Sequence, residues 1–245
     1  MIKSFLLRVS HKKFMVLVLG HRGCAGLEPE NTLRAFKRAL ELGVDMIEFD
    51  VRMTKDKKLV VIHDSKVDRT TNGKGFVKDY NFNDLRKLNA GLGEKIPSFE
   101  EVIDFLKDKK PIIVIELKEV EVAKDVLKKI KEEKIEDKVI IVSFWHNVLR
   151  KIKEDYKKIN TGAIFSGRPV NPISIAKSTK TKLLCLRYEF IDEDIVKQCH
   201  KNGIKINSWT VNEEIDIIKM IKLKVDIISS DYPNRVIEIL KTKII

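Results

Sequence analysis

The sequence predicts a single (β/α)8 TIM barrel with a short insertion after its second strand. Short apolar runs rich in Val and Ile recur along the 245 residues, and each is followed by a segment with apolar side chains at roughly 3.6-residue spacing. This alternation is typical of βα units around a parallel sheet. We count eight such units, which favours a closed barrel over an open sheet, and the chain length suits one barrel domain.

The expected strands are short runs dominated by branched apolar residues. They occupy residues 15–20, 44–51, 112–117, 138–143, 159–165, 182–188, 204–209 and 225–230. The expected helices follow at 31–42, 98–108, 121–133, 145–155, 172–178, 192–202, 212–223 and 232–242. The fifth unit has the weakest pattern. Asn31, Ser98 and Asn212 are predicted N-caps, and Gly43 and Gly203 stand where helices should end.

The alternation is interrupted once, after the second strand. Residues 55–58 read as a turn that leads into a second short strand at 59–63, and a polar loop follows. We therefore expect residues 64–97 to be a small inserted loop segment in a barrel that spans 15–245, with residues 1–14 as an N-terminal extension. Because barrel active sites are built from the loops after strands, the insertion is expected to form part of the substrate pocket.

Composition and charge indicate a globular chain with anionic partners. Hydrophobic residues make up 43% of the chain and charged residues 34%, enough to build a sizeable core. The net charge of +12 favours phosphate-bearing ligands. Both signs are mixed along the expected helix faces, and no arginine-rich stretch with interleaved aromatics occurs, so we expect no nucleic acid partner.

Cellular location is inferred from the cysteines and from the apolar runs. The three cysteines form no metal-type pair and leave an odd one over, which favours a reduced, cytoplasmic setting over a disulfide framework. The N-terminal segment lacks a small-residue cleavage site, so we do not interpret it as a signal peptide. No run reaches the ~18 apolar residues of a membrane span, so stable membrane insertion is not expected. The oligomeric state is left open.

Polar side chains gather where the first strands of the barrel end, and that end of a barrel carries its active site. The set is His21, Arg22, Glu48, Asp50, His63, Glu116 and Lys118. Three carboxylates at one barrel mouth would repel one another unless a divalent cation neutralised them, and an all-oxygen set suits Mg²⁺ or Ca²⁺ rather than zinc. The adjacent Arg22 and Lys118 would present fixed cations to an anionic oxygen, an arrangement suited to phosphoryl chemistry.

At these residues the sequence resembles the glycerophosphodiester phosphodiesterase family. The resemblance rests on blocks in the family's order that span about residues 16–240: His21-Arg22-Gly23, Pro29-Glu30-Asn31-Thr32, residues 43–50, His63-Asp64, residues 69–75, residues 96–101, Glu116-Leu117-Lys118, Ser208-Trp209-Thr210-Val211-Asn212 and residues 225–233. Ser230 replaces a usual Thr, Phe99 replaces a usual Leu, and the segment between His63 and Pro97 is short. The short segment favours substrates with small head groups.

The resemblance implies a role for each site residue. Glu48, Asp50 and Glu116 match the family's ligands for one divalent cation, Mg²⁺ or Ca²⁺ with Mn²⁺ as a further candidate. His21 and His63 match its acid/base pair, Arg22 and Lys118 its phosphate-contacting cations, and Trp209 an aromatic at the pocket wall. Glu30 fits better as a partner of Arg22 or His21 than as a ligand. The implied reaction is hydrolysis of a small-molecule glycerophosphodiester to glycerol 3-phosphate and an alcohol.

Several alternatives stay open at this point. The resemblance does not say which histidine is the acid, or whether water or a glycerol hydroxyl attacks phosphorus. A lysophospholipase D-like activity would need an exposed apolar surface at the barrel mouth, whereas the loops read as polar. A barrel that only binds glycerol phosphate or anionic lipid would have no need for two acid/base groups, so the intact set of histidines and carboxylates argues against it.

Overall fold

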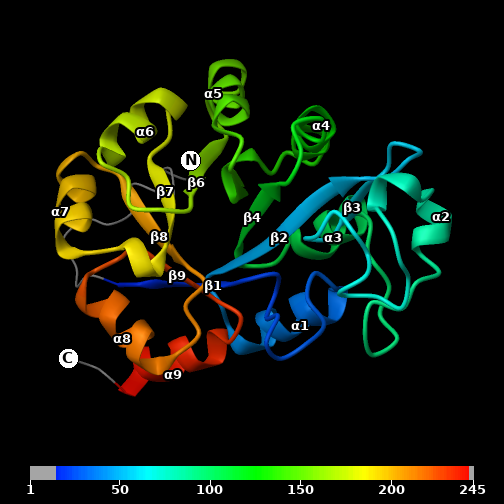
Figure 1. Cartoon of the computed structure of the whole chain (residues 1–245), viewed down its shortest axis with the longest axis horizontal. Helices are drawn as coiled ribbons and strands as arrows, with labels where there is room; N and C mark the ends of the chain where they lie inside the picture. Colours follow the sequence, from blue (N-terminus) through cyan, green and yellow to red (C-terminus); the bar gives the residue numbers. More distant parts are fainter. Residues whose placement is uncertain (1–14, 243–245) are drawn as a thin grey trace.

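The protein is a closed barrel of parallel strands surrounded by helices (Figure 1). The computed structural model describes residues 15–242, and the expected N-terminal extension 1–14 lies outside that range. In the described residues the barrel strands are β1 (Leu17–Gly20), β2 (Met46–Met53), β4 (Ile112–Leu117), β5 (Val139–Ser143), β6 (Asn160–Phe165), β7 (Leu183–Arg187), β8 (Lys205–Trp209) and β9 (Ile227–Ser230).

Closure of the barrel depends on β1, which pairs in parallel with β2 on one side and with β9 on the other. The remaining barrel strands lie in the order β9, β8, β7, β6, β5, β4, β2. The extra strand predicted after β2 is present as β3 (Leu59–Val61) and pairs antiparallel with the end of β2. The predicted TIM barrel is therefore confirmed, including the weak fifth unit, which forms β6 and α6.

Helices follow the barrel strands close to their predicted bounds. They are α1 (Leu33–Leu42), α3 (Phe99–Leu106), α4 (Ala123–Glu132), α5 (His146–Asp155), α6 (Pro172–Thr179), α7 (Glu193–Lys201), α8 (Glu214–Lys222) and α9 (Pro233–Thr242), with 3-10 turns η3 (Glu136–Lys138) and η4 (Tyr188–Phe190). Among the residues described here, none of these helices is long and apolar enough to cross a lipid bilayer.

Two predicted helix caps are wrong, and both asparagines have other partners. Thr32, rather than Asn31, caps α1 by accepting from the Ala35 amide. The residue before α8 is Glu213, whose side chain makes no capping bond. Ser98 does cap α3, and it forms a capping box with Glu101. Asn31 and Asn212 instead hydrogen-bond aspartates at the barrel mouth, as described below.

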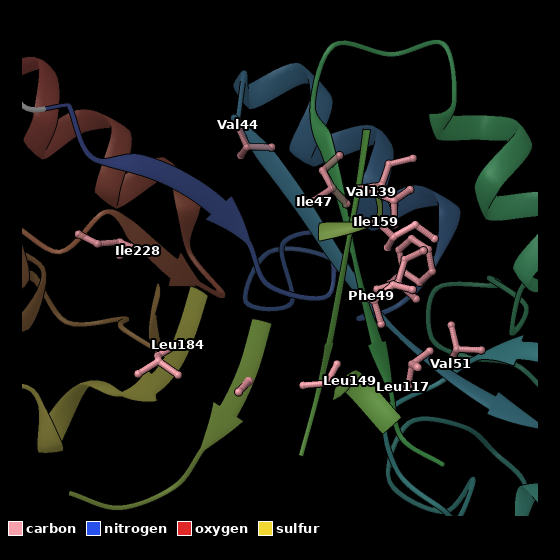
Figure 2. Packing of buried hydrophobic residues seen from close by; sticks show 14 of the residues in the cluster. Val44, Ile47, Phe49, Val51, Leu117, Val139, Leu149, Ile159, Leu184 and Ile228 are labelled. Atoms are coloured by element: carbon pink, nitrogen blue, oxygen red, sulfur yellow. The ribbon is translucent and has the colours of Figure 1, made fainter. Parts of the chain in front are cut away.

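Alternation along the strands separates the apolar core into two parts. On β2 the side chains of Ile47, Phe49 and Val51 face outward and pack beneath the helices (Figure 2). A smaller cluster fills the barrel interior: Leu19, Met46, Val114, Ile140, Val142, Ile164, Leu183, Cys185 and Ile227. The inward positions Glu48 and Asp50 lie on the other face of β2 from Phe49, so the same strand supports the outer core and the site.

The unusual Phe99 has a packing reason in the outer core. Its ring centroid lies 6.1 Å from that of Phe49, which in turn lies 5.7 Å from that of Phe36. All three rings are fully buried. Burial of a side chain of this size contributes roughly 1.5–3 kcal/mol, so the trio fixes α1 and α3 against β2.

The insertion has more structure than the expected loop. Residues 64–97 contain the 3-10 turn η2 (Val77–Asp79) and the short helix α2 (Phe82–Leu85). Its apolar side chains form a cluster of their own with the end of the β3 hairpin: Val60, Ile62, Val67, Val77, Leu85, Ala90 and Ile96. The insertion therefore has a small core that fixes it beside the barrel mouth.

Candidate active site

The predicted site residues converge on one cavity at the C-terminal ends of the strands. The cavity has a volume of about 350 Å³. Seven of the eight predicted residues line it: His21, Arg22, Glu48, His63, Glu116, Lys118 and Trp209. Asp50, the eighth, is 1% exposed and belongs to the acidic cluster at its edge. Apolar side chains of the barrel interior, including Val114, Val142 and Ile164, complete the walls.

Three carboxylates form the acidic cluster, and register explains their proximity. Asp50 on β2 is the direct partner of Glu116 on β4, and Glu48 lies two residues earlier on the same face of β2. One oxygen from each of the three lies within 4.8 Å of the others. Glu48 Oε1 and Asp50 Oδ1 are buried and have no hydrogen-bond partner in the part of the chain that the structure describes.

Burial and crowding change how readily these acids ionise. Burial, and then the charges of Asp50 and Glu116, raise the pKa of Glu48 well above its ordinary value. Burial and the Asp50 charge raise the pKa of Glu116 to about 7. Burial also opposes ionisation of Asp50, but Lys118 and His63 outweigh it and lower its pKa to about 2. Negative charge in the cluster is thus concentrated on Asp50 while its neighbours resist ionisation.

Two cations flank the cluster. Lys118 Nζ donates to Glu116 Oε1 at 2.6 Å and lies 3.4 Å from Asp50 Oδ1. Arg22 Nε lies 3.5 Å from Asp50 Oδ2, and the Arg22 amide donates to Glu48 Oε2 at 2.8 Å. Arg22 has a left-handed backbone with φ of 49°, a conformation that turns the chain sharply after β1. Both cations line the cavity, so they are available to an anionic ligand.

Each predicted histidine is paired with an aspartate through Nδ1. The distance is 2.6 Å from His21 Nδ1 to Asp231 Oδ1 and 2.6 Å from His63 Nδ1 to Asp64 Oδ1. Hydrogen bonds from Arg69 lower the pKa of Asp64. Burial works against ionisation of Asp231, but the His21 ring outweighs it and lowers the pKa. Because an ionised carboxylate only accepts hydrogen bonds, each Nδ1 donates, and Nε2 of a neutral ring is left as an acceptor.

The two aspartates are held in different ways. Asn212 Nδ2 donates to Asp231 Oδ2 at 2.8 Å, and Asn212 Oδ1 accepts from the Asp231 amide at 2.9 Å. Asp64 is instead hydrogen-bonded by Arg69, whose Nε donates to Asp64 Oδ2 at 2.7 Å. Arg69 also donates two hydrogen bonds of 2.7 Å to Glu30, and Glu30 accepts one of 2.8 Å from Arg22. The expected pairing of Glu30 with Arg22 is therefore present.

Five polar residues that support the site are not among the predicted site residues: Asn31, Asp64, Arg69, Asn212 and Asp231. Asp231 carries a usable signal, because it directly follows β9 just as His21 follows β1. The sequence favours Asn31 and Asn212 as helix caps, although Asn31 Nδ2 donates to Asp50 Oδ2 at 2.8 Å. Asp64 and Arg69 lie in blocks that carry the family resemblance, which is a usable signal, but the sequence does not show that Arg69 pairs with Glu30, 39 residues away.

Aromatic side chains form the remaining wall of the cavity. Trp209 ends β8, and its ring meets the Phe144 ring edge-on at a centroid distance of 6.0 Å. Both line the cavity. The indole Nε1 of Trp209 is buried without a hydrogen-bond partner among the described residues. Trp209 is thus a wall of the cavity and not only a core residue.

The loops around the mouth are less polar than the sequence suggested. Phe144 and Trp145 follow β5 and are 48% and 49% exposed. Val120 after β4, Val170 after β6 and Phe190 after β7 are also exposed. These strands are neighbours in the barrel. These are single apolar residues or one adjacent pair, too short to form a run that a sequence pattern detects, and the mouth therefore exposes more apolar surface than expected.

Fold and site together define a TIM-barrel enzyme with an acidic cluster suited to a metal ion and cationic side chains suited to a phosphate. Comparison with known proteins agrees with this class. Residues 21–235 match the model of the glycerophosphoryl diester phosphodiesterase family, and the chain belongs to that family.

Relatives of this chain extend over nearly its whole length. A glycerophosphodiester phosphodiesterase of Caldanaerobacter subterraneus is 41% identical over 237 residues, which cover 92% of this chain and 98% of the relative. A glycerophosphodiester phosphodiesterase of Bacillus altitudinis is 34% identical over 240 residues, with coverage of 92% and 98%. A phosphodiesterase of Oleispira antarctica, solved with its product sn-glycerol-3-phosphate, is 26% identical with a TM-score of 0.88 and coverage of 93% and 98%.

Proposed function

We propose that this enzyme hydrolyses glycerophosphodiesters to sn-glycerol 3-phosphate and an alcohol, with one divalent cation held by Glu48, Asp50 and Glu116. The observation that carries the proposal is the placement of two histidines, each bonded to an aspartate through Nδ1 so that Nε2 is left as the acceptor, around the same cavity as three crowded carboxylates and two cations. This combination offers proton transfer and charge stabilisation at one point, as phosphodiester hydrolysis requires.

The residues present fit a hard divalent cation. Glu48 Oε1 is a buried acceptor without a hydrogen-bond or ion-pair partner among residues 15–242, a costly arrangement unless a cation contacts it, and Asp50 Oδ1 has only the Lys118 ammonium at 3.4 Å. All candidate ligands are carboxylate oxygens, which favours Mg²⁺ or Ca²⁺, with Mn²⁺ also suited, over zinc. When bound, such an ion supplies Lewis-acid polarisation of a phosphoryl oxygen.

The roles of the remaining residues follow from their contacts. We assign Arg22 and Lys118 to the phosphate, because both line the cavity and carry fixed positive charge. We assign His21 and His63 to proton transfer at opposite sides of phosphorus. Asp231 and Asp64 hold the two rings so that Nε2 is presented to the substrate. Trp209 covers one side of the bound group with its apolar face.

A second substrate class is favoured by the exposed aromatic residues at the mouth. Phe144 and Trp145 stand beside the cavity and would accept the single acyl chain of a lysophospholipid, so a lysophospholipase D-like activity is the alternative. Comparing kcat/KM for glycerophosphocholine and lysophosphatidylcholine separates the two. We expect Phe144→Ala to reduce hydrolysis of the lysolipid more than that of glycerophosphocholine if the alternative holds.

Product analysis of the purified protein is the direct test. With Mg²⁺ or Ca²⁺ and glycerophosphocholine, we expect sn-glycerol 3-phosphate and choline in equal amounts. Binding of sn-glycerol 3-phosphate without turnover of any glycerophosphodiester would instead support a barrel that only binds its ligand.

We also propose a cytoplasmic location. The three cysteines are all buried as free thiols, as a reducing compartment would keep them. Cell fractionation tests this proposal, and recovery of the protein in an extracellular fraction would contradict it.

A further inference from the structure

Arg69 lies in the insertion, is not among the residues that line the cavity, and still contacts two carboxylates at the site. Its Nε and NH2 donate to Asp64 at 2.7 and 3.2 Å, and its NH1 and NH2 donate to Glu30 at 2.7 Å each. The guanidinium is therefore bidentate toward both partners. About half of its side chain is exposed, so the guanidinium itself is not a core group.

Each of these carboxylates leads to a different residue of the proposed machinery. Asp64 Oδ1 accepts from His63 Nδ1 at 2.6 Å, and Glu30 Oε1 accepts from Arg22 NH1 at 2.8 Å. A continuous series of hydrogen bonds thus runs from His63 through Arg69 to Arg22. His63 follows the β3 strand of the hairpin and Arg22 follows β1, so this series joins two separate segments of the mouth.

We propose that Arg69 is a positioning residue that sets the placement of His63 relative to Arg22, and that supplying it is the contribution of the insertion to the reaction. The inference rests on the proposed function, in which both side chains act on the same phosphodiester. A single exposed ion pair contributes little to stability. A planar guanidinium that donates to two carboxylates at once, however, restricts the positions of both. Without it, Asp64 and Glu30 are free to move, and a small displacement of a catalytic group is enough to lower the rate strongly.

The chain offers a matched control. Arg168, after β6, also bridges two acids, Asp192 and Asp194, at 3.0 to 3.3 Å, and its side chain is 35% exposed. Neither acid contacts the site residues. Arg69→Met and Arg168→Met therefore remove the same kind of bidentate guanidinium from the surface, but only Arg69 is bonded to carboxylates that contact residues lining the cavity.

The test measures three quantities for each variant at saturating Mg²⁺: kcat for glycerophosphocholine, Ki for sn-glycerol 3-phosphate, and the midpoint of thermal unfolding. For Arg69→Met we expect kcat to fall roughly 10- to 100-fold and Ki to rise about tenfold, the range for partners that orient a functional group. For Arg168→Met we expect both to stay within about twofold, because surface pairs of this kind contribute little.

Two further variants separate the two halves of this hydrogen-bond series, which we call arms: one runs from Arg69 through Glu30 to Arg22, and the other runs from Arg69 through Asp64 to His63. Glu30→Gln weakens only the arm to Arg22 and should raise Ki more than it lowers kcat. Asp64→Asn weakens only the arm to His63 and should lower kcat more than it raises Ki. Arg69→Lys keeps the charge but cannot close on both acids, so it should resemble Arg69→Met more than wild type, and it replaces that variant if Arg69→Met does not fold.

Two results would overturn the inference: an Arg69→Met enzyme with the kcat and Ki of wild type, or equal losses in Arg69→Met and Arg168→Met. Failure of the proposed function would look different, because wild type would then hydrolyse no glycerophosphodiester with Mg²⁺ or Ca²⁺. In that event calorimetric titration with sn-glycerol 3-phosphate tests the arm through Glu30 to Arg22, and an unchanged affinity in Arg69→Met overturns it.

Discussion

Replacing Glu116 with Gln should have opposite effects on the metal-free and the metal-bound protein. Glu116 is largely buried beside Asp50, and these two causes raise its pKa from 4.5 to about 7. A raised pKa means that the folded protein holds this proton more tightly than the unfolded chain does. The metal-free protein therefore loses stability as pH rises from about 4.5 to about 7, and the loss is complete above that range.

The size of the effect follows from the shift. A difference of about 2.5 pKa units, from 4.5 to about 7, corresponds to about 3 kcal/mol. The amide introduced by Glu116→Gln cannot ionise, so at pH 8 in EDTA the variant should be more stable than wild type by about that amount. For a chain of this length the midpoint of thermal unfolding should rise by roughly 6–12 °C. At pH 4 the two proteins should unfold alike, because Glu116 is protonated in both states.

Metal should reverse the order. A ligand at 1,000 times its Kd stabilises the folded state by about 4.1 kcal/mol, which exceeds the advantage of about 3 kcal/mol that the variant has in EDTA. Glu116→Gln should lose most of that gain because one ligand charge is removed. The assay is thermal and denaturant unfolding at pH 4 and pH 8, with EDTA and with Mg²⁺ or Ca²⁺. Glu121→Gln, an exposed change after the same strand, is the control. A Glu116→Gln protein no more stable than wild type at pH 8 in EDTA would refute the electrostatic reasoning, and an unchanged response to metal would move the third ligand elsewhere.

Three further predictions concern the reaction. Chelation with EDTA should abolish hydrolysis, and Mg²⁺, Mn²⁺ or Ca²⁺ should restore it; full activity after exhaustive chelation contradicts the metal assignment. Arg22→Lys should lower kcat/KM about tenfold or more, because Lys keeps the charge but lacks the planar guanidinium, which can donate to Glu30 and to phosphate together. Wild-type kinetics would show that Arg22 has only a structural role. His21→Ala and His63→Ala should each cut kcat by roughly 10²–10⁴-fold. Their double variant should lose much less than the product, and a folded His63→Ala enzyme with near-normal kcat would argue against the two-histidine mechanism.

The order of strands and helices was readable from the sequence because it is a local property. Alternation of apolar runs with helical spacing needs only neighbouring residues, so predicted and observed elements agree closely, for example 112–117 with β4 (Ile112–Leu117). Seven of the eight predicted site residues were also within reach of the sequence pattern, whereas Trp209 came from the family resemblance. A parallel barrel brings the C-terminal ends of its strands together, so a polar residue at such an end is a site candidate wherever it lies in the chain.

Contacts between distant segments were decided only by the tertiary structure. Asp231 lies 210 residues from His21, and closure of β1 on β9 brings the two together. The same folding brings Asn31 and Asn212 to aspartates, to which their amide groups donate, while the Thr32 hydroxyl takes the cap of α1. Arg69 reaches Glu30 only because the small core of the insertion fixes it beside the mouth. The sequence thus determined which chemical groups the protein has and at which strand ends they lie. The folded chain determined how they are paired, since hydrogen bonds act over a few ångströms of space and not along the sequence.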